Sequence, residues 1–536
     1  MIVTQHNARR TLFGALFLTM MTAVVPTALA QTTVKAVMAS DIKVFDPIFS
    51  ATNIARIHGY MVWDTLLSLD ANFQVRPQMV DRWTISDDKL TYTFFLRDGL
   101  VWNDGLPVTA EDCIASIKRW AVRDPMGQKL AEFTREYRAI NARSFSIVLK
   151  EPYGLVLNSL AKQAIPVPFM MPKRLAETDP YKQIPEIVGS GPFVFMKGEW
   201  RPGEKVVYTK NPRYKPRSEP ASGLAGGKVV NVDRVEWLAI PDPQTALNAL
   251  LAGEVDLLER VSVDLLPLAE KNPGVKLWPE GTATNYYMRL NWLHAPFNNA
   301  KIRQAAAMAL SQEDYLVGLN GNPKFYRFCK SVYPCGTPYA SDEGTQGWLE
   351  GNAQRARKML QDAGYDGTPV VFLATTDIPI TNNGGQITKS LLERAGFKVD
   401  VQSMDYQTLA LRSTKKDRPS EGGWSAFLGA PSATDITDPF MNQNLLSNCD
   451  KARPGWPCDE TMERLRNSFA RETVPEKRKE IAAAVQKHFL ETWTFIQLGE
   501  FFHVGGVRAN LTVPPRAAVP VFWGISRLSP RPGAAR

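Results

Sequence analysis

Apolar and polar residues alternate along residues 89–96, and the run ends at residues 97–99, Arg-Asp-Gly. A period of two residues predicts a half-buried β-strand that a turn terminates. Farther along, residues 114–120 place Ile, Ile and Trp at helical spacing, and Thr109 is a residue type that caps a helix N-terminus. Residues 141–150 alternate again. This stretch therefore predicts a strand, a helix and a second strand.

The second half of the chain is richer in helical periodicity. Runs with apolar residues at helical spacing span residues 302–310, 356–363 and 387–395. Gly364 and Gly396 follow the last two runs, as expected where a helix ends. Predicted strands and one further helix span residues 205–209, 234–239, 398–402 and 245–253. The succession of helix, glycine and strand predicts an α/β fold.

The N-terminal residues have the pattern of a cleavable signal peptide. Arg9 and Arg10 precede an apolar stretch at residues 12–25, and Ala28-Leu29-Ala30 is a small-x-small site before Gln31. We therefore expect residues 1–30 to be removed and the mature chain to reach the periplasm. The twin-arginine pattern is incomplete, which favours the general secretion route. No later segment holds 18 unbroken apolar residues, so we expect a soluble mature protein.

Composition and charge narrow the class of protein. With 536 residues, 44% hydrophobic and 22% charged, the chain can bury a large core and divide into two or more domains. Its formal net charge of +9 is small for this length, and residues of opposite sign alternate along the chain. Nucleic-acid binding is therefore not expected.

The cysteines predict short-range disulfides. Cys329 lies close to Cys335 in the sequence, and Cys449 lies close to Cys458, each pair in a loop-like stretch. An oxidising compartment favours pairing within each stretch, although other pairings of four cysteines stay open. Cys113 lies in the predicted amphipathic helix and is expected to be buried. Neither pair has C-x2-C spacing, so we expect no metal site.

Several blocks, in order, resemble the peptide/nickel class of extracellular solute-binding proteins, which includes dipeptide- and oligopeptide-binding proteins. The first blocks lie at residues 64–66, 76–83, 92–99 and 102–112. Later blocks are Gly189-Ser190-Gly191-Pro192-Phe193, Asn211-Pro212-Arg213-Tyr214, Gly253-Glu254-Val255-Asp256, Asn291 with Pro296-Phe297-Asn298, and Ile302-Arg303-Gln304-Ala305. The chain departs from the family pattern at Met79-Val80 and at Cys113.

The resemblance implies a two-lobed periplasmic-binding-protein clamshell with an additional inserted small domain. Lobe I would comprise residues 31–75, 190–283 and 500–536, the inserted domain residues 76–189, and lobe II residues 284–499. A peptide or other small organic ligand would bind between the lobes without a cofactor. The closed, monomeric protein would then deliver it to the inner-membrane permease of an ABC importer and its ATPase subunits.

Asp435 is the candidate partner for a ligand ammonium group. Peptide-binding members use an aspartate in a W-x-x-D-x-x-D-P segment, and Asp435-Ile436-Thr437-Asp438-Pro439 meets the second part of it. Ser432 stands where the family has tryptophan, and this leaves room for a different cation or a bulkier ligand. Asp435 as a capping acid stays an alternative, and Asp438 is expected to be a turn residue.

Further candidate ligand contacts are Arg412, Ser40, Gly189, Ser190, Gly191, Asn285, Tyr287 and Trp424. Arg412 corresponds to an arginine that some members direct at a peptide carboxylate, and a solvated arginine is the alternative. Residues 189–191 would bring backbone close to the ligand or form a structural turn. Trp424 would stack on the ligand or belong to the core.

Alternative functions have weaker support in the sequence. The sequence holds no G-x-S-x-G, phosphate-loop, H-E-x-x-H, C-x-x-C or G-x-G-x-x-G motif, so we expect no enzyme and, in particular, no secreted hydrolase. Within the family, nickel chelates, haem, opines and sugars are alternative cargoes. A periplasmic chaperone or signalling receptor with the same fold also stays open.

Overall fold

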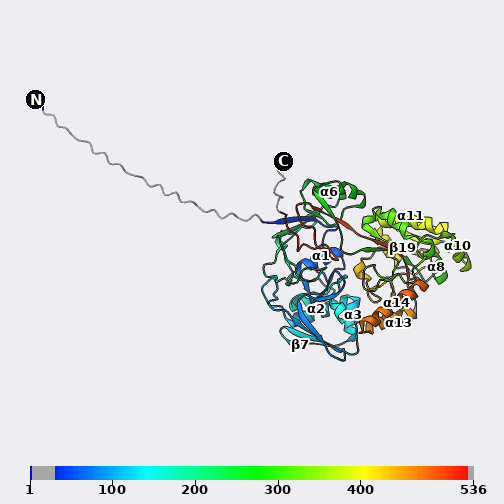
Figure 1. Ribbon diagram of the computed structural model, residues 1–536, viewed down its shortest axis with the longest axis horizontal. Helices are drawn as coiled ribbons and strands as arrows, with labels where there is room; N and C mark the ends of the chain where they lie inside the picture. The colour runs from blue at the N-terminus through cyan, green and yellow to red at the C-terminus, as the bar shows by residue number, and fades with distance from the viewer. Residues whose placement is uncertain (3–30, 529–536) are drawn as a thin grey trace.

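A computed structural model describes residues 1–2 and 31–528 of the chain (Figure 1). Apart from Met1 and Ile2, the predicted signal peptide lies outside the described residues, as does the tail after Pro530. The described residues form two lobes, with α1, α2, α3 and α6 on one side of Figure 1 and α8, α10 and α11 on the other.

The first lobe is built on a seven-stranded sheet with the order β10-β11-β12-β1-β13-β21-β14. Its strands are β1 (Thr33–Val37), β10 (Phe193–Phe195), β11 (Lys205–Lys210), β12 (Arg234–Leu238), β13 (Leu257–Leu258), β14 (Val275–Pro279) and β21 (Val504–Arg508). β1 runs parallel to β12 and β13. Helix α6 (Pro243–Ala252) begins at the side-chain cap of Asp242 and ends at Gly253, whose φ of 83° suits glycine. The helix predicted at residues 245–253 is thus confirmed.

A separate four-stranded antiparallel sheet has the order β5-β6-β8-β7. It comprises β5 (Val80–Ile85), β6 (Thr91–Leu96), β7 (Thr134–Asn141) and β8 (Ser144–Leu149). Helices α2 (Ala110–Arg123) and α3 (Pro125–Phe133) contact this sheet. α2 begins where it was expected, because Thr109 and Asp112 form a capping box, and Cys113 on this helix is buried.

The second lobe is built on a six-stranded sheet with the order β16-β20-β15-β19-β17-β18. Its strands are β15 (Thr284–Leu290), β16 (Tyr326–Arg327), β17 (Val370–Thr375), β18 (Val399–Met404), β19 (Ala426–Gly429) and β20 (Phe495–Phe501). Its helices are α8 (Ala300–Ala309), α9 (Gln312–Asn320), α10 (Ala353–Asp362), α11 (Pro379–Arg394), α12 (Tyr406–Ser413), α13 (Glu460–Arg471) and α14 (Pro475–Thr492). The three predicted helical runs coincide with α8, α10 and α11.

Shorter elements complete the first lobe and its four-stranded sheet. They are α1 (Asn53–Val62), α4 (Val156–Leu160), α5 (Lys173–Ala176), α7 (Leu266–Glu270), β2 (Asp64–Thr65), β3 (Leu67–Leu69), β4 (Val75–Pro77) and β9 (Phe169–Met170). β2 pairs with β9, which joins residues 169–170 to the first lobe. The division of the chain into lobe I, inserted domain and lobe II at these boundaries stays a prediction.

Two chain crossings join the sheets of the two lobes, between β14 and β15 and between β20 and β21. They lie side by side, because the Glu280 amide donates to the His503 carbonyl at 2.8 Å. Glu280 is buried beside a second buried carboxylate, Glu259, and Arg260 Nε lies 3.7 Å from Glu280 Oε1. Burial raises the pKa of Glu280 to about 7, against the opposing charges of Arg260 and Arg56. The crossing therefore holds a carboxyl group that titrates near neutral pH.

Glu280 makes the stability of the protein depend on pH. Between the ordinary pKa of a glutamate and pH 7, the folded chain holds a proton that the unfolded chain releases, so stability falls as pH rises through this window. The wild-type protein should lose on the order of 3 kcal/mol of its free energy of unfolding between pH 5 and pH 8, and we expect Glu280→Gln to remove this loss. Chemical denaturation at both pH values measures the free energy of unfolding. Glu254→Gln, at an exposed glutamate, is the matched control, and equal pH dependence in wild type and Glu280→Gln would contradict the assignment.

Candidate functional site

A cavity of about 670 Å³ lies between the second lobe and the segment that follows α2. This volume is within the range of about 300–1,000 Å³ that is typical of small-ligand sites. Residues 124–126, 162 and 164–165 line one side of it. The other side is formed by residues of β15, α12, β19 and the loop from residue 430 to residue 454. The cavity therefore joins segments that are far apart in the sequence.

The walls are largely apolar with a few charged groups. Apolar and aromatic lining residues are Met126, Ile165, Tyr287, Tyr406, Leu409, Phe427, Leu428, Ile436, Phe440 and Met441. Charged lining residues are Asp124, Lys162, Arg289, Asp435 and Arg453. Apolar walls with a small number of placed charges are the usual composition of a site that binds and orients a small organic molecule.

The central strands of the second lobe form the floor of the cavity. Tyr287 and Arg289 alternate along β15, so both point to the same face of the sheet. Tyr287 pairs with Gly429 on β19. A Cβ atom at Gly429 would lie 2.5 Å from the Tyr287 ring, so glycine there makes room for that ring at the cavity.

Asp124 and Lys162 form a buried ion pair on the opposite wall. Lys162 Nζ lies 2.6 Å from Asp124 Oδ2 and also donates to the Ala164 carbonyl at 2.9 Å. Asp124 Oδ1 accepts the amides of Met126 and Gly127 at the start of α3. Burial raises the pKa of the Asp124 carboxyl, and the Lys162 ammonium opposes that effect. These two side chains satisfy each other inside the wall.

Asp435 lies at the end of a short 3-10 helix, Ala433–Asp435, and lines the cavity. It is half-buried, and its carboxylate accepts a 3.3 Å hydrogen bond from Thr434 Oγ1. Asp438, by contrast, is buried and accepts the amides of Phe440 and Met441, which confirms it as a turn residue. The Asp435 carboxylate is therefore available to a cationic group in the cavity.

Contacts outside the cavity lining hold the two sides together. Arg56 on α1 donates to the Gln163 carbonyl at 3.2 Å and to Thr434 Oγ1 at 3.3 Å. At a second contact, the Gly154 amide donates to the Ala470 carbonyl at the end of α13 at 2.9 Å. A Cβ atom at Gly154 would lie 1.7 Å from the Glu472 carbonyl oxygen, so only glycine permits this approach. The structure thus has its lobes in contact around the cavity.

Other residues proposed from the sequence lie outside this cavity. Gly189, Ser190 and Gly191 pack against the end of α1, where the Gly191 amide donates to the Val62 carbonyl at 2.8 Å. Ser40 borders a separate small hollow beside β11 and β12.

Three residues of the second lobe are also held by other parts of the protein. Trp424 is fully buried in an apolar cluster, and Asn285 Oδ1 accepts a hydrogen bond from Gln497 Nε2. Arg412 donates to the carbonyls of Gly422 and Gly423. Asp435 and Tyr287 are thus the sequence candidates that the cavity brings together.

The candidates proposed from the sequence did not include four charged residues that line the cavity, Lys162, Asp124, Arg289 and Arg453. A charged residue within the otherwise apolar strand 286–290 was the available signal for Arg289. For Lys162 and Asp124 the sequence offers no comparable signal, because their segment reaches the cavity only through the packing of the lobes.

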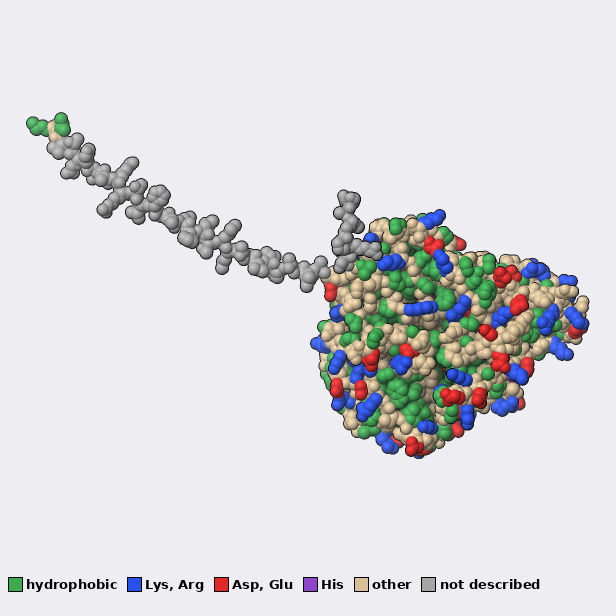
Figure 2. Space-filling view, in the orientation of Figure 1, with side chains coloured by type: hydrophobic (Ala, Val, Ile, Leu, Met, Phe, Trp, Pro, Cys, Tyr) green, Lys and Arg blue, Asp and Glu red, His purple; other side chains and the backbone are tan. Residues whose placement is uncertain are grey.

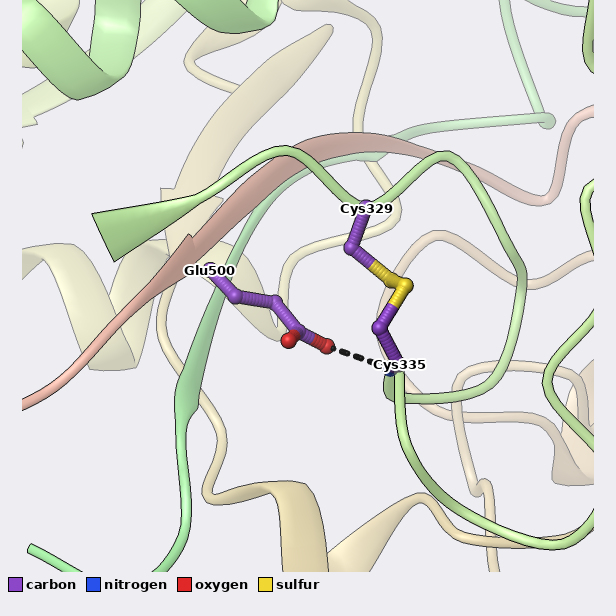
Figure 3. A group of neighbouring side chains, drawn as sticks. All are labelled: Cys329, Cys335 and Glu500. Atoms are coloured by element: carbon purple, nitrogen blue, oxygen red, sulfur yellow. Dashed lines mark hydrogen bonds between the residues drawn. A yellow bond between two sulfur atoms is a disulfide. The ribbon is translucent and has the colours of Figure 1, made fainter. Parts of the chain in front are cut away.

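The cysteines of the second lobe lie in two disulfides. Cys329 is bonded to Cys335, with an S–S distance of 2.10 Å, and Cys449 is bonded to Cys458. The first disulfide lies beside the buried carboxylate of Glu500, which accepts the Cys335 amide at 3.0 Å (Figure 3). Arg327 Nε lies 2.5 Å from the same carboxylate. Because both sulfur atoms are bonded to each other, this group is a structural staple of the lobe rather than a set of metal ligands.

The surface carries both signs of charge. Lys and Arg side chains are interspersed with Asp and Glu side chains on the face shown in Figure 2. Among residues 31–528, no helix has the length and apolar character that a membrane span requires.

Comparisons with known proteins agree with one another. Residues 74–453 match the family described as bacterial extracellular solute-binding proteins, family 5 middle. The chain is 37% identical over 531 residues to a probable peptide ABC transporter periplasmic-binding protein of Sinorhizobium fredii, with 97% of this chain and 99% of that protein covered.

Two solved structures share the fold. One is the ABC transporter-associated periplasmic binding protein DppA of Helicobacter pylori in complex with the peptide STSA, with a TM-score of 0.75, 19% identity, and 93% and 99% of the two chains covered. The other is MoaA of A. tumefaciens R10 in complex with mannopinic acid, with a TM-score of 0.72, 19% identity, and 93% and 100% covered.

Substitutions at the buried Asp124–Lys162 ion pair test how strongly these two residues are coupled in the cavity wall. We expect Lys162→Met to lower the free energy of unfolding by about 3–5 kcal/mol, because it leaves a buried carboxylate without its cation. Asp124→Asn keeps a side chain that can cap α3. The variant with both substitutions should therefore lose less free energy of unfolding than the two single variants together. In a double-mutant cycle measured by denaturation, we expect this difference to be about 0.5–3 kcal/mol. Strict additivity would contradict the coupling.

Proposed function

We propose that this chain, which belongs to family 5 of the bacterial extracellular solute-binding proteins of ABC transporters, captures a peptide-sized ligand in the cavity between residues 124–165 and the second lobe. The observation that carries the proposal is the position of Asp435. Its carboxylate lines a largely apolar cavity and has no protein cation bonded to it among the described residues. A peptide ammonium group would complete its hydrogen bonds.

The relatives support a peptide as the ligand. The Sinorhizobium fredii protein, which covers nearly the whole chain, is named as a probable peptide-binding protein, and the DppA structure holds a tetrapeptide. An opine is the second candidate. Residues 430–433, Ala-Pro-Ser-Ala, are small where peptide-binding members place a tryptophan, and the similar MoaA structure holds mannopinic acid.

The same membership supports the partners and compartment. We propose that the mature protein is a periplasmic monomer, and that its closed form delivers the ligand to an inner-membrane permease with its ATPase subunits. The family is one of transport-associated binding proteins, which supports binding without chemical turnover. The mixed surface charge is compatible with this soluble role and gives no reason to expect nucleic acid as a partner.

Binding and turnover are tested together with the tetrapeptide Ser-Thr-Ser-Ala. A hundredfold excess over the dissociation constant should stabilise the purified protein by about 2.7 kcal/mol in a thermal-shift measurement. Mass spectrometry after long incubation should recover the peptide intact. A cleaved peptide would overturn the binding-protein assignment, and stabilisation by mannopinic acid alone would replace the peptide with an opine.

Asp435 should contribute to affinity and little to stability. We expect Asp435→Asn to weaken Ser-Thr-Ser-Ala binding about 10- to 100-fold, the value of a hydrogen bond to a charged group, with little change in melting temperature. Asp366→Asn, at an exposed aspartate outside the cavity, is the matched control. Unchanged affinity in calorimetric titration of Asp435→Asn would remove this residue from the site.

A further inference from the structure

Arg289 is a cation buried at the cavity floor without an anionic partner. Its side chain is 2% exposed. Nε donates to the Pro454 carbonyl at 2.7 Å and Nη1 to the Asn444 carbonyl at 3.3 Å, while Nη2 has no hydrogen-bond partner among the described residues. A buried charge that lacks a counter-charge is costly, so an anionic group of a ligand in the adjoining cavity would offset that cost.

Arg453 places a second guanidinium at the same cavity. It is exposed, lies one residue before the carbonyl group that Arg289 contacts, and also lines the cavity. Among the ion pairs within residues 31–528, the charged residues that line the cavity contribute only the Asp124–Lys162 pair. Burial and the charge of Arg453 lower the pKa of Arg289, against the effect of Tyr287, to about 10, so Arg289 is still charged at neutral pH.

The remaining charges of the cavity do not balance these two arginines. Asp124 and Lys162 neutralise each other across 2.6 Å. Among the remaining charged residues that line the cavity, Asp435 is then the one carboxylate and Arg289 and Arg453 are two guanidinium groups. A complementary ligand has one ammonium group, which binds Asp435, and two carboxylates, which bind the two arginines.

We propose that the cavity selects an anionic amino diacid, one ammonium group with two carboxylates, and that Arg289 and Arg453 are the residues that determine this specificity. The inference rests on the proposed function and narrows its ligand class. An acidic peptide and a glutamate-derived opine share this chemistry. Arg289 takes the role that the sequence assigned to Arg412, whose guanidinium is bound to the carbonyls of Gly422 and Gly423.

Isosteric dipeptides test the proposal. Calorimetric titration of the purified protein compares Ala-Glu with Ala-Gln, which differ by one carboxylate, and a parallel titration uses mannopinic acid. We expect Ala-Glu to bind about 10- to 100-fold more tightly than Ala-Gln, the value of a charge-assisted contact. Stronger binding of mannopinic acid than of Ala-Glu would assign the diacid to the opine class, and the reverse order to the peptide class.

Variants separate recognition from structure. In Arg453→Gln, an exposed position, the preference for Ala-Glu should fall at least several-fold while the melting temperature stays unchanged. Arg289→Gln should abolish the preference, and Arg303→Gln is its matched control. Arg303 is equally buried and donates to the carbonyls of Thr492 and Phe297, but it does not line the cavity. Arg303→Gln should reduce stability and keep the preference.

The outcomes distinguish this inference from the proposed function. Equal affinity for Ala-Glu and Ala-Gln, or a preference that survives in both Arg453→Gln and Arg289→Gln, would overturn the inference while peptide binding stands. Failure of Ser-Thr-Ser-Ala, both dipeptides and mannopinic acid to bind would overturn the proposed function and this inference with it.

Discussion

Charge buried at the junction of two lobes is the constraint on which the site depends. An ionised group in a dry cavity is tolerated only when hydrogen bonds and an opposite charge accompany it. On the wall that follows α2, the protein meets this requirement itself, because Lys162 and Asp124 bond to each other and to backbone groups. On the other wall, Arg289 and Asp435 lie without ionic partners. In our proposal, this asymmetry distinguishes a ligand-binding cavity from a packed interface.

Contacts outside the cavity lining hold its two walls together. Arg56 on α1 reaches both the Gln163 carbonyl and Thr434, the neighbour of Asp435. The close approach of Gly154 to the end of α13 supplies a second contact between the same two sides. Both contacts require the lobes to be together, whereas the paired crossings near Glu280 are covalently continuous with both sheets. A ligand that fills the cavity would therefore favour the arrangement in which these contacts form.

Local structure was predictable from the sequence where local chemistry decides it. The capping box at Thr109 and the left-handed glycine at Gly253 place two helix ends correctly, because each signal acts within a few residues. Asp435 was found from a motif, and the structure places it at the cavity. The role of Lys162 was not predictable, since its segment reaches the cavity through the packing of separate lobes. Trp424 illustrates the opposite difficulty, because an aromatic residue upstream of the Asp435 segment has the same sequence signal whether it faces ligand or core.

The most direct measurement is a crystal structure of the protein with Ala-Glu bound. It should show the peptide between residues 124–126 and residues 427–441, its ammonium group on Asp435 and a carboxylate on Arg289 or Arg453. A peptide bound instead beside Ser40 or residues 189–191, or on the outer surface with the cavity empty, would contradict the account.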